Sequence, residues 1–386
     1  MKKKLKMALV PAACMLAAMA HAQNPETGDT LQFRVNAGIE RDSNVLRAPN
    51  KVSDEIGTLG VGARYDKQIS LQRIVVDAEA RTHKHRDLSA LDYNTVNYNA
   101  AWNFAITPQF RGIASATREQ YRDITNATTG VDESAVRSER VERLEGTYTT
   151  GVGWLGQGGF SHRQSRSDSA RALESSPSVR STYVGVGREF PAGTQLLARY
   201  RFGKGEYDRI TGAGREFDEN ELSLIARYPL STRTSVEGRI GRLKREHDGA
   251  PQRDFSGTIA SITADWGITF KTSLQAGLSR DIGSYESGAG GSITGNRFFI
   301  QPVWRATEKT AVRLRYQRDQ REWAVAAGSP DAGRDDTLHY TGVSVDWEPR
   351  RNLVVTTGLR GERRNSNVDL YDFSATIFQV GARFTF

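Results

Sequence analysis

Apolar and polar residues alternate along most of this chain with a period of two, the spacing that puts successive side chains on opposite faces of a β-strand. The last residues show the pattern clearly: Phe378, Val380, Ala382, Phe384 and Phe386 alternate with polar residues and glycine. Helical periodicity is almost absent. The alternating segments are each about 10 residues long, which is the length that a tilted transmembrane strand needs.

The same alternation predicts a series of strands separated by connectors of two kinds. Short connectors alternate with long ones that are rich in Gly, Ser, Asp, Asn and Arg, as in outer-membrane barrels with short periplasmic turns and long extracellular loops. The phase is unclear after Gly151 and between Tyr183 and Phe190. The remaining predicted strands are centred on residues 31–39, 59–65, 74–80, 96–104, 110–116, 144–148, 196–202, 222–228, 236–240, 260–266, 274–278, 298–304, 312–316, 343–347, 353–359 and 378–386.

We therefore predict an all-β fold: a transmembrane, antiparallel, up-and-down outer-membrane β-barrel of about 18 strands over residues 31–386. Both termini should lie in the periplasm, and the first and last strands should pair, because an open sheet of this size would leave exposed edges. For the C-terminal segment taken alone, the alternative interpretation is an ordinary edge strand of a soluble β-domain. The final strand resembles the closing strand of bacterial outer-membrane barrels, which implies that Gln379, Gly381, Phe384 and Phe386 form the signal recognised by the barrel-insertion machinery.

The first residues predict export from the cytoplasm. Four lysines precede an apolar run from Met7 to Ala20, and Ala20-His21-Ala22 is a small-x-small cleavage site, so residues 1–22 are a predicted signal peptide. Residues 23–30 would form a short periplasmic segment. The single Cys, Cys14, leaves with the signal, so the mature chain has no disulfide framework. We predict location in the outer membrane of a Gram-negative bacterium.

Net charge and hydropathy narrow the function classes. Removing the four signal lysines leaves 49 Lys and Arg against 45 Asp and Glu, a net charge of +4, so the basic composition does not indicate nucleic-acid binding. The mean hydropathy of −0.55 is compatible with a barrel, in which only alternate residues face lipid. Trp102, Trp266, Trp304 and Trp347 each come just before a short connector, where an aromatic belt at the membrane interface is expected.

The polar face of the predicted strands is rich in arginine and almost free of lysine. Guanidinium groups bind carboxylate and phosphate in a two-pronged geometry, so a cationic lumen would favour anionic solutes. The alternative is that arginines pair with lumen acids in ladders that only stiffen the wall. The candidate transport-lining residues are Arg34, Arg64, Arg73, Arg81, Arg111, Arg143, Arg199, Arg201, Arg227, Arg239, Arg313, Arg315 and Arg360.

Signals for catalysis are weak, and we expect no enzyme, no cofactor and no metal site. Gly-x-Ser-x-Gly and HExxH motifs are missing from the sequence. His83 and His85 have metal-like spacing but lie next to Lys84 and Arg86, which would repel a divalent cation. A catalytic group formed by His162 or His339 with an acid distant in the sequence remains an open alternative. The basic run 360–364 is interpreted as a solvated loop that could also contact lipopolysaccharide phosphates.

Two short motifs suggest a family. Asp42-Ser-Asn44-Val-Leu-Arg47 resembles a D-x-N-x-x-R stretch of porin-2-type barrels. Residues 254–257, the turn after Trp266 and residues 279–281 resemble the EpsL family, outer-membrane barrels of exosortase-B-associated exopolysaccharide clusters. The resemblance covers the mature chain and carries over no site residues.

That resemblance implies passive export or assembly of an extracellular polysaccharide. The alternatives are a general or anion-preferring porin and a plugged structural or adhesive barrel. The expected partners are outer-membrane lipid and lipopolysaccharide, the insertion machinery, polysaccharide or small anionic solutes, and periplasmic export proteins, with no nucleic acid.

Overall fold

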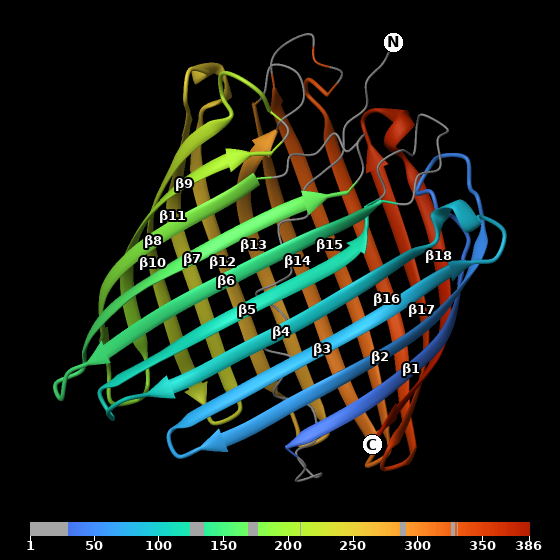
Figure 1. Cartoon of the computed structure of the whole chain (residues 1–386), viewed down its shortest axis with the longest axis horizontal. Coiled ribbons are helices and arrows are strands. Elements are labelled where there is room, and N and C mark those ends of the chain that lie inside the picture. The colour runs from blue at the N-terminus through green and yellow to red at the C-terminus, as the bar shows by residue number, and fades with distance from the viewer. Residues whose placement is uncertain are drawn as a thin grey trace.

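The computed structural model describes residues 30–123, 135–168, 177–208, 210–285, 291–325, 329 and 331–386, which form one closed antiparallel barrel (Figure 1). Eighteen strands follow one another around the barrel in chain order. They are β1 (Leu31–Asp42), β2 (Asp54–Ile69), β3 (Gln72–His85), β4 (Tyr93–Ala105), β5 (Phe110–Arg122), β6 (Val136–Thr149), β7 (Trp154–Ser167), β8 (Pro177–Glu189), β9 (Gln195–Tyr207), β10 (Glu216–Ser231), β11 (Thr234–His247), β12 (Phe255–Gly267), β13 (Thr272–Tyr285), β14 (Gly291–Thr307), β15 (Thr310–Val325), β16 (Asp335–Arg350), β17 (Leu353–Ser366) and β18 (Phe373–Thr385).

The first and last strands pair and close the barrel, which confirms the predicted fold class and strand count. Gly38 of β1 lies opposite Gly381 of β18 in an antiparallel register. At the end of this seam the backbone groups of Phe33 and Phe386 form two reciprocal hydrogen bonds of 2.8 and 2.9 Å. Their rings also stack, with centroids 6.1 Å apart. Closure leaves no strand edge exposed, which a membrane-spanning sheet requires.

The two faces of the barrel differ as the alternation predicts. Large apolar side chains point outward and stay exposed, for example Ile39 at 65% and Val61 at 57%. Polar and charged side chains point into the lumen. The four belt tryptophans also point outward near the short turns, each 44–52% exposed. A closed barrel with an apolar exterior and a polar interior is the architecture of outer-membrane proteins, and this places the protein in the outer membrane.

Turn lengths distinguish the two ends of the barrel. Short turns, such as residues 70–71, 232–233 and 351–352, join the strands at one end, and the C-terminus lies at that end (Figure 1). Longer connections, such as residues 43–53, 86–92 and 367–372, join them at the other. In barrels of this type, short turns face the periplasm and long loops face outward. Among the described residues, no helix is both long and apolar enough to span a membrane.

Two strands depart from the sequence pattern for clear physical reasons. The ambiguous phase around Tyr183 arises because this aromatic ring points into the lumen, while Val184 and Val186 point outward. Its ring occupies the space left by Gly159 on β7, where an added Cβ would lie 2.5 Å from the tyrosine. The interpretation of residues 360–364 as a solvated loop is wrong. These residues belong to β17, in which Arg360 lies on the lumen face.

The residues of the predicted insertion signal lie on both faces of β18. Gln379 and Gly381 are on the lumen face, whereas Phe384 and Phe386 are exposed on the lipid face at 43% and 64%. Recognition of these residues by the insertion machinery stays a prediction. The predicted signal peptide over residues 1–22 lies outside the described residues, as do residues 23–29 of the predicted periplasmic segment.

Deletion of Phe386 should lower both the yield and the stability of the folded barrel. The change removes the two backbone hydrogen bonds to Phe33 and the ring contact, so we expect a loss of about 2 kcal/mol in unfolding free energy. Heat-modifiable migration on gels and urea unfolding measure the two quantities. Phe378→Ala, an outward aromatic higher on the same strand, is the control. Normal insertion and folding of the deletion variant would show that the terminal residue is dispensable.

Candidate functional site

A ladder of ion pairs covers the lumen wall formed by β1, β2 and β3. Arg34 of β1 donates two hydrogen bonds to Asp77 of β3, at 2.6 and 2.8 Å, and one to Glu79 at 3.2 Å. The guanidinium reaches β3 by crossing over β2 at Gly62. A Cβ at that glycine would lie 2.8 Å from Arg34 Nε and 2.8 Å from the Ala78 carbonyl oxygen. The glycine is therefore a requirement of the ladder.

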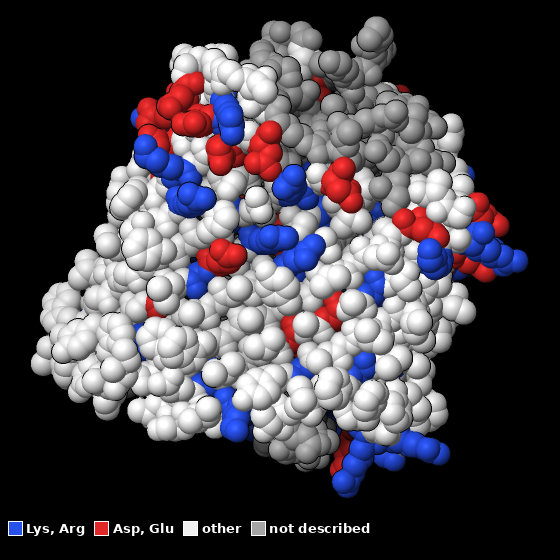
Figure 2. Space-filling view, in the orientation of Figure 1, with Lys and Arg blue, Asp and Glu red and all other residues white. Residues whose placement is uncertain are grey.

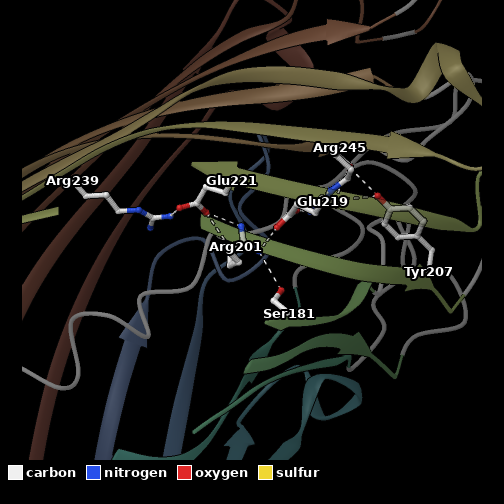
Figure 3. Close-up of polar contacts among 8 residues, drawn as sticks. Ser181, Arg201, Tyr207, Glu219, Glu221, Arg239 and Arg245 are labelled. Carbon is white, nitrogen blue, oxygen red and sulfur yellow. Dashed lines mark hydrogen bonds and ion pairs between the residues drawn. The ribbon is translucent and has the colours of Figure 1, made fainter. Parts of the chain in front are cut away.

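A second ladder crosses β8 to β11 and is more deeply buried (Figure 3). Arg201 donates to Glu219 at 2.5 Å and to Glu221 at 2.7 Å, while Arg239 pairs with Glu221 and Arg245 with Glu219. Glu219 and Glu221 are only 5% and 2% exposed. Removing one partner of such a buried pair leaves an uncompensated charge and costs several kcal/mol, about 3–5. The two glutamates of this ladder are therefore fixed in place, and their negative charges are neutralised by the three arginines.

The wall formed by β14 to β18 differs, because guanidinium groups outnumber carboxylates there. We call six of its lumen-facing arginines the arginine wall: Arg297, Arg305, Arg313, Arg315, Arg360 and Arg383. Arg321 and Arg364 also face inward, nearer the long loops. Four acids lie on the lumen face of these strands in the described part of the chain, and one of them, Asp336, pairs with Arg334 at the long-loop end. Asp319 binds Arg297 at 2.9 Å, and Asp346 pairs with Arg313; Glu362 binds Arg360 at 2.8 Å.

Two arginines of this wall keep free donor groups. Arg315 bonds the neutral amide of Gln317 at 2.7 Å, and Arg383 bonds the amide of Asn36 at 3.2 Å. Within the described part of the chain, neither has a carboxylate within 4.0 Å. Arg305 and Arg383 both lie within electrostatic range of Arg313. The arginine wall therefore presents a surplus of positive charge to the lumen.

The arginines predicted to line the lumen all lie on the inward face of their strands, although a role in transport stays a prediction. Arg199, Arg227 and Arg315 have no carboxylate partner among the described residues, and Arg199 lies 5.3 Å from the Tyr183 ring centre instead. The others form ion pairs with lumen acids: Arg34, Arg64, Arg73, Arg81, Arg111, Arg143, Arg201, Arg239, Arg313 and Arg360.

Several lumen residues were missed by the sequence analysis. Arg297 and Arg305 lie between the outward residues of β14, so the alternation there could have placed them inward. Glu219 and Glu221 were missed because β10 begins at Glu216, before the apolar alternation starts at Leu222. A charged strand end that extends beyond the membrane has little apolar signal.

The motif Asp42–Asn44–Arg47 shapes the loop of residues 43–53. Asp42 accepts a hydrogen bond from the Asn44 backbone N–H at 2.8 Å and pairs with Arg47 at 2.6 Å. The Asn44 amide donates to the carbonyls of Ala48 and Ser374 at 2.8 and 3.1 Å. Arg47 itself has a positive φ of 52°, which turns the chain sharply. The three polar residues of the motif therefore fold the loop back onto β18.

This loop crosses the mouth of the barrel at the long-loop end. On one side Arg47 donates to Glu362 of β17 at 2.7 Å, and on the other Arg122 at the end of β5 donates to the Val45 carbonyl at 3.1 Å. Asn44 and Val45 of the loop are themselves buried, at 0% and 2% exposure. Burial alone would lower the pKa of Arg47, but Glu362 and Asp42 raise it above its ordinary value. The loop narrows the entrance and is fixed to the arginine wall through Glu362.

The histidines considered for metal or catalytic roles have other contacts. The His83 ring stacks on Tyr93, with centroids 4.2 Å apart. His162 lies on the outer wall, 3.4 Å from Glu142, and His339 bonds Tyr316 at 3.2 Å. Among the described residues, no group of three His, Cys, Asp or Glu side chains could hold a metal ion.

Comparison with solved structures gives bacterial outer-membrane barrels of similar size. OpdK from Pseudomonas aeruginosa shares 11% identity with a TM-score of 0.48, covering 92% of this chain and 99% of that chain. OccK2 (OpdF) from the same organism, solved with glucuronate, shares 12% with a TM-score of 0.48, covering 92% and 98%. OprD shares 10% with a TM-score of 0.46, covering 92% and 94%. Likeness at this level adds no argument about the solute.

No family model matches the sequence, and no curated protein matches it either. The resemblance to EpsL-type barrels therefore stays a prediction. The barrel itself is porin-like in strand number, closure and polar lumen.

Gly62→Val should disrupt the ladder on β1 to β3. The added side chain would displace Arg34 and the β3 backbone, so we expect the unfolding free energy to fall by about 1–3 kcal/mol, as for overpacked sites. Urea unfolding in detergent measures it. Gly295→Val is the matched control, since a Cβ at Gly295 has nothing within 4 Å. Equal stability of the two variants would contradict the crossing role of Gly62.

Arg47→Ala should widen the entrance. The substitution removes the contacts of the loop with Glu362 and Asp42, so the loop loses its attachment to β17 and single-channel conductance should rise. Arg86→Ala, an exposed arginine on the neighbouring loop that pairs with Glu55 at 2.7 Å, is the control. Unchanged conductance in Arg47→Ala would mean that this loop does not limit flow.

Proposed function

We propose that this barrel is a passive channel for small anionic solutes. The observation that carries the proposal is the surplus of guanidinium over carboxylate on β14 to β18, with Arg315 and Arg383 bonded only to neutral amides. A fixed positive charge inside a low-dielectric wall raises the local concentration of anions. Arginine donors also match carboxylate oxygens in geometry.

The paired ladders have a different part in this proposal. Because the acids of the two ladders, on β1–β3 and β8–β11, are already bonded to arginines, the ladders contribute shape and little net attraction. Unpaired acids also face the lumen: Glu40 lies near Arg360 and Arg47, and Asp281 near Arg239 and Arg297. Surrounding arginines offset these charges, so the resulting preference for anions is moderate.

The loop of residues 43–53 favours a small solute over a polymer as the transported molecule. Residues 43–53 bridge from β17 and β18 to β5 across the mouth, and a polymer would have to displace them. Export of an extracellular polysaccharide, implied by the EpsL resemblance, requires this loop to move. Gene deletion separates the two functions: a channel predicts slower uptake of small anions with surface polysaccharide unchanged, whereas an exporter predicts the reverse.

Arg315→Gln combined with Arg383→Gln should weaken anion selectivity. A unit charge about 7 Å from a permeating ion in water contributes roughly 0.6 kcal/mol, favourable for an anion and unfavourable for a cation, so each substitution should lower the anion-to-cation permeability ratio by up to about sevenfold. Reversal potentials across planar bilayers in a salt gradient measure this ratio. The effect should shrink as salt rises, because screening shortens the reach of the charge.

Arg363→Gln is the matched control, since Arg363 lies on the outer face of β17 at the long-loop end and bonds Asn365. It removes the same charge outside the lumen and should leave the ratio unchanged. Equal selectivity of the lumen double variant and the wild type would overturn the role of the arginine wall.

A further inference from the structure

A groove of about 920 Å³ runs along the outer, lipid-facing wall over β3 to β9. Its floor is made of small residues, with Ala114 on β5 and Thr182 on β8 in the same lateral row. Ala114 lies between Trp102 and Leu144, and Thr182 between Phe160 and Phe202. In this row Leu144 and Phe160 are neighbours, and a small side chain follows on either side of them, between two large ones. The gaps at the small residues form channels that run along β5 and β8.

The dimensions of these channels suit hydrocarbon chains. Neighbouring strands are about 4.8 Å apart, so the large side chains that flank each small residue start about 9.6 Å apart. The channels are lined by apolar carbon and open toward the lipid. A channel of this width accepts extended acyl chains.

Positive charges lie directly above this row, toward the long loops. His162, Arg180 and Lys204 are neighbours in the next lateral row, and Arg118 and Arg140 are neighbours in the row above that. All lie on the outward face of their strands. Figure 2 shows Lys and Arg, interspersed with Asp and Glu, on the upper part of this face, above a broad band that is largely uncharged.

These cations are only weakly neutralised. In the described part of the chain, Arg140 and Arg180 have no carboxylate within 4.0 Å, and Lys204 lies 3.9 Å from Asp218. Two acids lie within the patch: Glu142 contacts His162 at 3.4 Å, and Glu206, in the same lateral row as Arg140, pairs with Arg215 at 3.2 Å. Beyond Lys204, Asp218 and Glu246 lie in the same row and end the cationic patch.

We propose that this groove is a binding site for lipopolysaccharide, with the phosphates of its lipid A on Arg140, Arg180 and Lys204 and its acyl chains in the groove. The long-loop end faces outward, so the cations lie at the level of the phosphorylated glycolipid of the outer leaflet. An anionic headgroup attached to several acyl chains matches a cationic patch placed directly over parallel apolar channels. The site is on the outer wall and is independent of the lumen.

The test uses the full chain in mild detergent, titrated with purified lipid A and, separately, with phosphatidylglycerol, and bound lipid is counted by native mass spectrometry. Each cation near a charged lipid contributes about fivefold to affinity, so Arg140→Gln/Arg180→Gln/Lys204→Gln should weaken lipid A binding roughly a hundredfold. Ala114→Trp, which fills the groove without changing charge, should also weaken it.

The matched control is Arg242→Gln/Lys244→Gln/Arg363→Gln, which removes three outward cations at the same end of the barrel but away from the groove. It should bind lipid A as the wild type does. Three outcomes would overturn the site: equal binding by the groove and control variants, no effect of Ala114→Trp, or an equal loss of phosphatidylglycerol binding in the groove variant. Heat-modifiable migration shows that each variant is folded.

Discussion

Backbone hydrogen bonding in lipid is the constraint on which this structure depends. Inside the hydrocarbon, each unpaired N–H or C=O group costs several kcal/mol, so a sheet must pair both of its edges. The seam between β1 and β18 meets this requirement, with glycine and alanine pairs at its centre and reciprocal Phe33 and Phe386 bonds at its end. Closure then separates an apolar exterior from a polar lumen. All functional chemistry follows from that separation.

Within the lumen, small residues decide which charges can meet. Gly62 lets Arg34 cross a whole strand to reach Asp77, and Gly159 gives Tyr183 the space to contact Arg143 and Glu145. Each crossing joins polar groups from strands that are not neighbours, β1 with β3 and β8 with β6. The walls are therefore stiff where arginine and acid are matched. The largest surplus of arginine over acid is left on β14 to β18.

Much of the barrel could be predicted from the sequence, because lipid contact imposes a strict two-residue period. The orientation of Arg34, Arg199 and Arg315 followed directly from this period. The residue at which β10 begins could not be predicted, because Glu219 and Glu221 lie on a strand extension with little apolar signal. Tyr183 was ambiguous because its inward position depends on a glycine in another strand. Alternation determines the face of a residue but not its partner across the lumen.

The contacts of the loop of residues 43–53 could not be predicted from the sequence either. Asp42, Asn44 and Arg47 stood out as a motif, but their contacts with Ser374 and Glu362 join residues more than 300 positions apart in the chain. Only barrel closure brings these segments together, so no local pattern could predict that the loop crosses the mouth. The motif is now explained by geometry: it folds the loop back and fixes it to the arginine wall.

The central claim is that the lumen passes small anions in preference to other solutes. The most direct measurement is swelling of proteoliposomes that contain the wild-type barrel, with a small organic anion, an organic cation and a neutral sugar of equal size compared at low salt. We expect fastest entry of the anion, with the difference between the solutes decreasing as ionic strength rises. Equal rates for anion and cation, or no entry of any solute, would contradict it.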